Sequence, residues 1–139
     1  MKTMSFLLVD DDADDRELFI DAVNEIDQNI SCITATNGQQ AIEFLRNAES
    51  TLPDFIFLDL RMPRLDGKKC LAEIKGDEKL RHIPVIIYTT SKGVDESKEL
   101  RDMGAFYFIS KPNNPEEIYF LISFVMEEQF NAARRKLES

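Results

Sequence analysis

The sequence predicts an α/β fold in which a five-stranded parallel sheet lies between two layers of helices. Apolar runs and amphipathic segments alternate five times along the 139 residues, and this strict alternation is typical of parallel sheets with helical crossovers. The apolar runs are nearly continuous, as in Phe55 to Leu58, which is the pattern of strands buried on both faces. Right-handed crossovers then restrict the arrangement to few topologies.

The first two units of strand and helix follow from local patterns. Residues 5–9 are a mostly apolar run that is expected to form the first strand, and the second strand is expected near residues 30–35. Residues 13–26 carry apolar side chains at the spacing of one helix face. The next helix is expected to begin after Asn37, because asparagine is a favoured N-cap. Its apolar stripe consists of Ala41, Ile42, Phe44 and Leu45.

Glycine and proline delimit the next two units. A strand at residues 54–58 leads through a loop to a helix that begins at Gly67. Pro84 introduces the fourth strand. The fourth helix, over residues 93–103, is short and polar, and it is expected to end at Gly104 because glycine is the usual residue just after a helix.

The last unit consists of a strand at residues 105–110 and a helix capped by Asn114. Pro115 suits the first helical position, where a missing N–H has no cost. The helix is expected to end near residue 130. One domain therefore spans residues 1–130, and residues 131–139 form a polar tail that frays or is foreign to the natural protein.

The composition excludes several classes of function. Seventeen basic and 26 acidic residues give a net charge of −9 and a pI of 4.6, whereas nucleic-acid binding usually needs a basic patch and a high pI. The longest apolar run is far shorter than the roughly 20 residues of a membrane span, and no secretory signal is present. We therefore expect a cytoplasmic protein that binds neither nucleic acid nor membrane. His82 is the single histidine, which excludes a multi-histidine metal site. Cys32 and Cys70 form no motif and are expected to be free thiols.

Polar side chains follow the apolar runs where the predicted strands end. The first run stops at Asp10 and Asp11, the third at Asp59, the fourth at Thr89 and the fifth at Lys111. The carboxyl ends of parallel strands share one edge of the sheet, where ligands bind in open α/β folds. Each feature alone has an ordinary structural explanation, such as helix capping for the acids or a turn for Lys-Pro. Four such strand ends together favour a chemical site.

Three crowded carboxylates are stable only beside a cation. Two carboxylates about 4 Å apart repel by roughly 4 kcal/mol at an effective dielectric constant of about 20. Mg²⁺ prefers one or two carboxylates together with waters and phosphate oxygens, so we expect Asp10, Asp11 and Asp59 to hold Mg²⁺, with Mn²⁺ as the alternative ion. Aspartate is ionised at neutral pH and needs no general base to act as a nucleophile. Asp59 could therefore attack a phosphoryl group whose oxygens are neutralised by Mg²⁺, Lys111 and Thr89.

These residues and their spacing resemble the receiver domain of two-component response regulators over about residues 5–128. The resemblance implies the flavodoxin-like three-layer (βα)5 sandwich with strand order 2-1-3-4-5. It also implies a phosphoaspartate at Asp59, a magnesium ligand in the backbone carbonyl of Arg61, and a cis Lys111–Pro112 bond. The motifs that carry the resemblance are Leu8-Val9-Asp10-Asp11-Asp12, Leu58-Asp59-Leu60-Arg61-Met62-Pro63 with Asp66-Gly67, Tyr88-Thr89-Thr90, Gly104-Ala105 and Lys111-Pro112.

The resemblance also implies a switch. Thr89 would move towards the phosphoryl group, and the residue three before the conserved lysine would change rotamer. That residue is Phe108, where receivers commonly have a tyrosine, so it lacks the hydroxyl that helps to hold the inward state. Arg61 and Ser91 would flank the phosphoryl group and tune its lifetime. The fourth helix, fifth strand and fifth helix would form the partner surface, with residues 92–103 and Phe106 at its centre.

The implied partners are proteins. A sensor histidine kinase or a histidine phosphotransfer protein would supply the phosphoryl group, and an unidentified downstream protein would read the switch or receive the phosphoryl group in a relay. The chain is expected to act as a single-domain regulator, as a monomer or a weak homodimer. It would be no enzyme beyond its own phosphorylation and slow dephosphorylation.

Three other interpretations remain open from the sequence. A phosphorylation-independent adaptor would keep the fold for binding alone. A phosphohydrolase of the haloacid dehalogenase type would need a second aspartate two residues after the nucleophile, where this chain has Arg61. A calcium-binding loop starting at Asp10 would need glycine and glutamate where the chain has Asp15 and Asp21.

Overall fold

The computed structural model describes residues 4–47, 49, 51–60, 66–90, 94–112 and 114–138. Five parallel strands form one sheet in the order β2-β1-β3-β4-β5, so the predicted flavodoxin-like fold is confirmed. The strands are β1 Ser5–Val9, β2 Ser31–Ala35, β3 Phe55–Leu58, β4 Val85–Thr89 and β5 Tyr107–Ser110.

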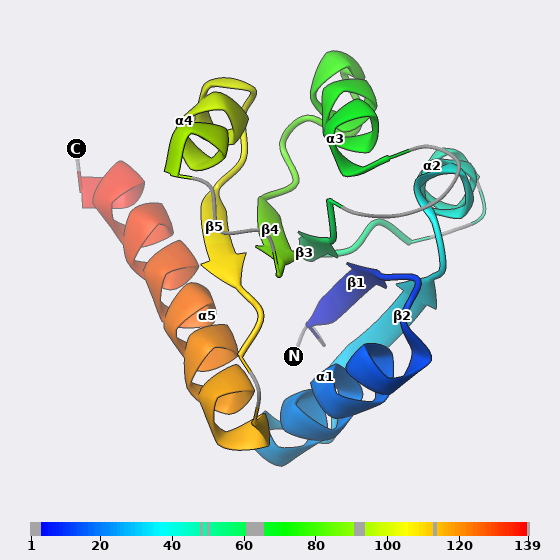
Figure 1. The fold of residues 1–139 in the computed structure, drawn as a ribbon. Helices are drawn as coiled ribbons and strands as arrows, with labels where there is room; N and C mark the ends of the chain where they lie inside the picture. The colour runs from blue at the N-terminus through cyan, green and yellow to red at the C-terminus, as the bar shows by residue number, and fades with distance from the viewer. Residues whose placement is uncertain are drawn as a thin grey trace.

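Helices cover both faces of the sheet and complete a three-layer sandwich. Figure 1 shows α1 and α5 together on one side of the strands and α2, α3 and α4 on the other. Of the helices in the described part of the chain, none combines the length and apolarity that a bilayer span requires. The helices are α1 Ala13–Ile26, α2 Gly38–Arg46, α3 Gly67–Gly76, α4 Val94–Asp102 and α5 Pro115–Glu138.

Each face of the sheet has its own hydrophobic core. Leu7 and Val9 of β1 pack with α2 and α3, whereas Phe6 and Leu8 pack with α1 and α5. Alternate residues of one strand therefore enter opposite cores, which explains the continuous apolar runs. The core under α1 contains five aromatic rings, which lie at edge or tilted angles that aromatic pairs favour. These rings belong to Phe6, Phe19, Phe55, Phe57 and Tyr88.

The strand register brings the polar strand ends to one level. Val9 lies opposite Leu58 in the β1–β3 pair, and the amide of Asp59, the residue after β3, donates to the Val9 carbonyl oxygen at 3.0 Å. Beyond the end of the β4–β5 pair, the Lys111 amide donates to the Thr89 carbonyl oxygen at 2.8 Å. The backbone ladder therefore continues past the strands and fixes the first residues of the loops that follow.

The helix caps agree with the sequence analysis. Asp12, Asn37 and Asn114 each accept a hydrogen bond from an amide of the first turn of α1, α2 and α5. Gly104 follows α4 with a φ of 107°, which is the left-handed region that glycine adopts without strain.

Two details differ from the expectations. The helix expected to end near residue 130 continues to Glu138, because the sequence Asn-Ala-Ala-Arg-Arg-Lys-Leu-Glu contains no helix breaker and several strong helix formers. The division of the chain at residue 130 stays a prediction. The expected cis bond between Lys111 and Pro112 is wrong: no described peptide bond is cis, and the trans form is favoured by about 0.5–1 kcal/mol for X–Pro bonds.

Candidate functional site

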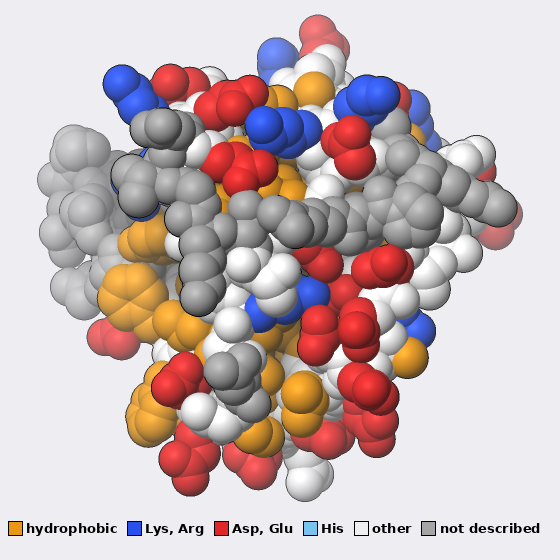
Figure 2. All heavy atoms as spheres, viewed as in Figure 1, with side chains coloured by type: hydrophobic (Ala, Val, Ile, Leu, Met, Phe, Trp, Pro, Cys, Tyr) orange, Lys and Arg blue, Asp and Glu red, His pale blue; other side chains and the backbone are white. Residues whose placement is uncertain are grey.

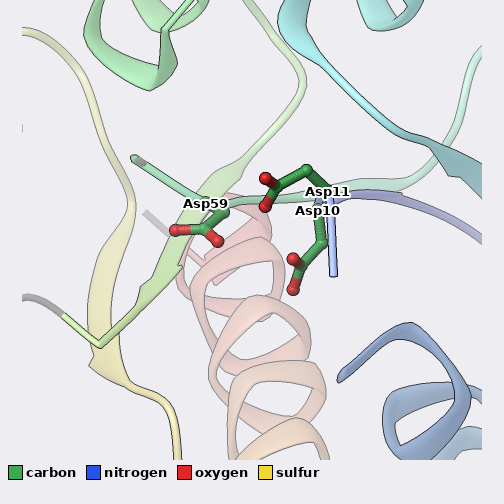
Figure 3. A group of neighbouring side chains, drawn as sticks. All are labelled: Asp10, Asp11 and Asp59. Atoms are coloured by element: carbon green, nitrogen blue, oxygen red, sulfur yellow. The ribbon is translucent and has the colours of Figure 1, made fainter. Parts of the chain in front are cut away.

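Three carboxylates meet where β1 and β3 end. Oxygen atoms of Asp10, Asp11 and Asp59 lie within 4.8 Å of one another. Figure 3 shows Asp11 reaching from the end of β1 towards Asp59 at the end of β3. Asp10 and Asp59 are buried, whereas Asp11 is exposed. The structure thus brings together the three predicted cation ligands, with one of them open to solvent.

Lys111 places its ammonium group among the acids. Its Nζ lies 2.7 Å from Asp10 Oδ2, 2.9 Å from Asp15 Oδ2 and 3.0 Å from Asp59 Oδ2. The side chain is 8% exposed, and the Tyr88 ring lies 5.8 Å from Nζ. Burial lowers the Lys111 pKa, but the contacts of the ammonium group with the carboxylates of Asp10, Asp15 and Asp59 outweigh burial and raise the pKa above its usual value. The group is therefore a permanent positive charge at the site.

Asp10 contains the clearest mark of a cation site. Its Oδ1 accepts a hydrogen bond from the Asp12 amide at 3.0 Å. Its buried Oδ2 has no hydrogen-bond partner among the described residues; the 2.7 Å contact with Lys111 is an ion pair without hydrogen-bond geometry. Burial is the main cause that raises the Asp10 pKa, partly offset by Lys111 and the Asp12 amide. An unsatisfied buried oxygen costs about 1–3 kcal/mol, and a divalent cation bound there would remove that cost. The donor set fits such an ion.

Thr89 and Lys111 hold the two oxygens of Asp59. The fully buried Thr89 hydroxyl donates to Asp59 Oδ1 at 2.9 Å, and Lys111 Nζ donates to Asp59 Oδ2 at 3.0 Å. The three residues follow or end β3, β4 and β5, which are neighbours in the sheet. A carboxylate fixed in this way has a defined direction of attack and two donors near any group that joins it.

Asp15 is a site residue that the sequence interpretation missed. The acidic residues of a first helical turn usually face solvent, but the Asp15 carboxylate accepts a hydrogen bond from Lys111 at 2.9 Å. A signal was present in the sequence. Asp15 precedes Phe19, Ala22 and Val23, the buried residues of α1, by four, seven and eight positions, and this spacing puts it on the helix face that packs on the sheet.

Gly67 is a second residue whose importance was not recognised. A Cβ atom at this position would lie 2.5 Å from the Asp59 carbonyl oxygen and 2.5 Å from Leu60 Cα. The Gly67 amide also donates to the Leu60 carbonyl oxygen at 3.2 Å. The first turn of α3 therefore packs directly on the backbone of Asp59 and Leu60, here called the Asp59 loop, and glycine is the residue that allows this approach.

The remaining predicted residues lie elsewhere. Arg61 and Ser91 are outside the described residues, so their predicted roles stay predictions. Phe108 is half-buried, lies opposite Ile87 in the sheet and packs against the core under α2, α3 and α4. The calcium-loop interpretation is wrong, because α1 already begins at Ala13 and leaves no room for a loop of about 12 residues.

The surface around the site is acidic, and a different surface is apolar. Figure 2 shows acidic side chains gathered around a small basic group near the centre of this face, with hydrophobic side chains on the side of β5 and α5. Phe120 and Phe124 of α5 are 67% and 50% exposed, and the Phe124 ring lies 5.8 Å from that of Tyr107. Large exposed aromatic side chains of this kind are typical of protein-binding surfaces.

The sequence matches known signalling proteins over most of its length. The family described as "Response regulator receiver domain" matches residues 6–123. The response regulator Rcp1 of Synechocystis is 29% identical over 120 residues, which cover 84% of this chain and 82% of that protein. A protein-glutamate methylesterase of Syntrophomonas wolfei is 35% identical over 115 residues, 81% of this chain. The present chain spans about a third of that longer relative, 31% of its length.

Solved structures share the same fold. The phosphorylated cyanobacterial phytochrome response regulator RcpA superposes with a TM-score of 0.83 at 30% identity, covering 91% of this chain and 93% of that one. The Mn(2+)-bound form of Rcp1 gives a TM-score of 0.79 at 28% identity, with 88% and 91% covered. In these two relatives the fold accommodates a phosphorylated state and a divalent metal ion.

Proposed function

The chain belongs to the response regulator receiver domain family, and from this membership we propose that it accepts a phosphoryl group on Asp59. The observation that carries the proposal is the environment of Asp59. Thr89 and Lys111 each donate to one of its oxygens. Asp10 and Asp11, which follow β1, have carboxylate oxygens close enough to those of Asp59 for all three residues to bind one cation. Receiver domains bind divalent metal ions, and we propose Mg²⁺ as the ion for this chain.

The proposed reaction needs little proton transfer. An Asp59 oxygen forms a bond to phosphorus while the bond from phosphorus to the imidazole nitrogen of a phosphohistidine breaks, and the electron pair stays on the imidazole. Asp10, Asp11 and Asp59 would hold Mg²⁺, which when bound supplies positive charge to a phosphoryl oxygen. Lys111 supplies a second positive charge, and the Thr89 hydroxyl supplies a donor.

We propose a histidine kinase or a histidine phosphotransfer protein as the phosphoryl donor. Phosphorylation adds negative charge and acceptor oxygens beside Thr89 at the end of β4. A shift of Thr89 towards them would alter the packing of Phe108, which lies beside β4 in the sheet. The proposed output surface is the face of α4, β5 and α5. The exposed Phe120 and Phe124 on α5 support this choice, and the downstream protein that binds there is undefined.

The test is phosphorylation of the purified chain by acetyl phosphate, followed by intact mass. We expect the wild type to gain the mass of one phosphoryl group in the presence of Mg²⁺ and to gain none after chelation. Asp59→Asn should gain none under either condition. Asp14→Asn is the matched control, because it removes an exposed acid from the same edge of the molecule. A wild type that gains no mass would favour the phosphorylation-independent adaptor. An Asp59→Asn variant that gains the mass as readily as wild type would overturn Asp59 as the acceptor.

A further inference from the structure

The ammonium group of Lys111 is shared with an acid that is not one of the proposed cation ligands. Asp15, on the first turn of α1, accepts a hydrogen bond from Nζ at 2.9 Å, as Asp59 does at 3.0 Å. Because both oxygens contact the same nitrogen, they lie less than about 6 Å apart. The Asp15 side chain is 35% exposed, so its carboxylate is anchored at the rim of the site.

Lys111 has few donors to spare. A lysine ammonium has three N–H donors. Two of them are engaged by Asp15 and Asp59, and Asp10 occupies the third side of the group in an ion pair at 2.7 Å. A phosphoryl group on Asp59 would bring new anionic oxygens that must compete for these donors. Asp10 is a proposed ligand of the cation, so Asp15 is the partner whose only described role is to hold Lys111.

We propose that Asp15 is a positioning residue that draws Lys111 towards α1 and so weakens its hold on the phosphoryl group. This inference rests on the proposed phosphorylation of Asp59. The Asp15 carboxylate acts through Lys111, because it engages an N–H donor of the ammonium group that the phosphoryl oxygens need. Asp15 thus keeps phosphorylation slower and shorter-lived than the other site residues would allow.

The test compares two variants that remove one charge from the same turn. Asp15→Asn removes the carboxylate that contacts Lys111, and Asp14→Asn removes its exposed neighbour. With acetyl phosphate and Mg²⁺, we expect Asp15→Asn to be phosphorylated about fivefold faster than Asp14→Asn, which corresponds to about 1 kcal/mol. After removal of the donor, it should lose the phosphoryl group more slowly. Asp15→Glu, whose carboxylate can still reach Lys111, should restore wild-type behaviour.

A double-mutant cycle separates positioning from a merely structural role. In a Lys111→Met background, Asp15→Asn should change the phosphorylation rate no more than Asp14→Asn does, because the contact through which it acts is gone. The rate advantage of Asp15→Asn should also shrink at high salt. Thermal unfolding of each variant checks that the fold is kept, and Asp15→Ser is the second charge-removing variant should Asp15→Asn fail to fold.

The two proposals fail in different ways. If the wild type takes up no phosphoryl group, the proposed function falls and the role of Asp15 falls with it. If the wild type is phosphorylated but Asp15→Asn equals Asp14→Asn or is slower, the role of Asp15 alone is overturned. An equal effect of Asp15→Asn with and without Lys111 would also overturn it.

Discussion

Asp10 is held in a position that its protein neighbours do not fully satisfy. Its side chain is buried, its Oδ2 lacks a hydrogen bond, and burial raises its pKa despite the nearby Lys111. We predict that Asp10→Asn increases the free energy of unfolding of the metal-free protein by about 1 kcal/mol, because it removes a negative charge that burial disfavours more than Lys111 favours it. Urea unfolding in chelator measures this, with Asp14→Asn as the control.

With Mg²⁺ added, the wild type should become more stable than Asp10→Asn. An ion that binds only the folded state stabilises it by RT ln(1 + c/Kd), where c is the concentration of the free ion. The wild type should therefore gain stability with Mg²⁺, whereas Asp10→Asn, which lacks a charged ligand, should gain much less. Equal gains for both proteins would contradict the placement of the ion at Asp10.

The pH dependence of the stability difference between the wild type and Asp10→Asn follows from the direction of the Asp10 pKa shift. Because the Asp10 pKa is raised in the folded state, the folded state binds more protons than the unfolded state between the usual pKa of 3.8 and the raised value. This group therefore adds stability to the metal-free wild type as the pH falls through that window. The advantage of Asp10→Asn should shrink on acidification, and an advantage that grows instead would contradict the assignment.

The sequence located most of this site because its residues follow strands directly. Asp10, Asp59, Thr89 and Lys111 end apolar runs, and parallel strands bring such ends together. Asp15 lies inside a helix, where charged residues of the first turn usually face solvent. Its contact with Lys111 depends on how α1 is rotated against the sheet, and that rotation is set by packing of residues such as Phe19.

At the scale of elements, α3 is placed against the Asp59 loop through one glycine. We predict that Gly67→Ala lowers the free energy of unfolding by about 1–3 kcal/mol, the usual cost of forcing an atom into a packed region, because its Cβ would lie 2.5 Å from the backbone of Asp59 and Leu60. Phosphorylation of Asp59 should slow as well, since the loop must move.

Gly76 provides a matched control in the same helix. A Cβ at Gly76 would meet nothing within 4 Å, so Gly76→Ala should stabilise the protein by about 0.4–1 kcal/mol through the unfolded state and leave phosphorylation unchanged. Urea unfolding and intact mass measure both effects. Similar behaviour of the two alanine variants would contradict the close approach of α3 to the Asp59 loop.

Element boundaries were predicted well where a local signal marks them. Asn37 and Asn114 begin helices as expected, and Gly104 follows one. The end of α5 was placed eight residues too early, because the polarity of residues 131–138 was interpreted as a tail. Polar residues with high helix propensity continue a helix that is already nucleated, so polarity alone did not define its end.

At the scale of the whole molecule, hydrophobic patterning predicted a buried parallel sheet but not the order of its strands. Continuous apolar runs indicated strands buried on both faces, which holds for β1, β3 and β4 but not for the edge strands β2 and β5. The strand order came from the family resemblance and not from the pattern. The two separate cores explain why the pattern was so clear. The central strands β1, β3 and β4 supply buried residues to both cores, so the polar residues of these three segments lie at or just beyond the strand ends.

The reaction rates of the two cysteine thiols measure how often the packing around them opens. Burial raises the pKa of the Cys32 thiol to about 11 and that of Cys70 to about 12, and Cys70 Sγ lies 3.9 Å from the Gly38 carbonyl oxygen between α3 and α2. The thiolate is the reactive form. We therefore predict that native protein reacts very slowly with a disulfide reagent at pH 8, whereas unfolded protein reacts at once.

Because Cys70 becomes reactive only when the packing of α2 on α3 opens, its reaction rate should depend on the distant acidic site. In a Cys32→Ala variant, Cys70 is the single thiol, and Mg²⁺ bound to the folded state should slow its reaction by the factor with which the ion lowers the open population. Asp59→Asn should weaken this protection. If the reaction rate of Cys70 did not change with Mg²⁺, the packing of α2 on α3 would open locally, independently of the sheet edge that holds Asp10 and Asp59.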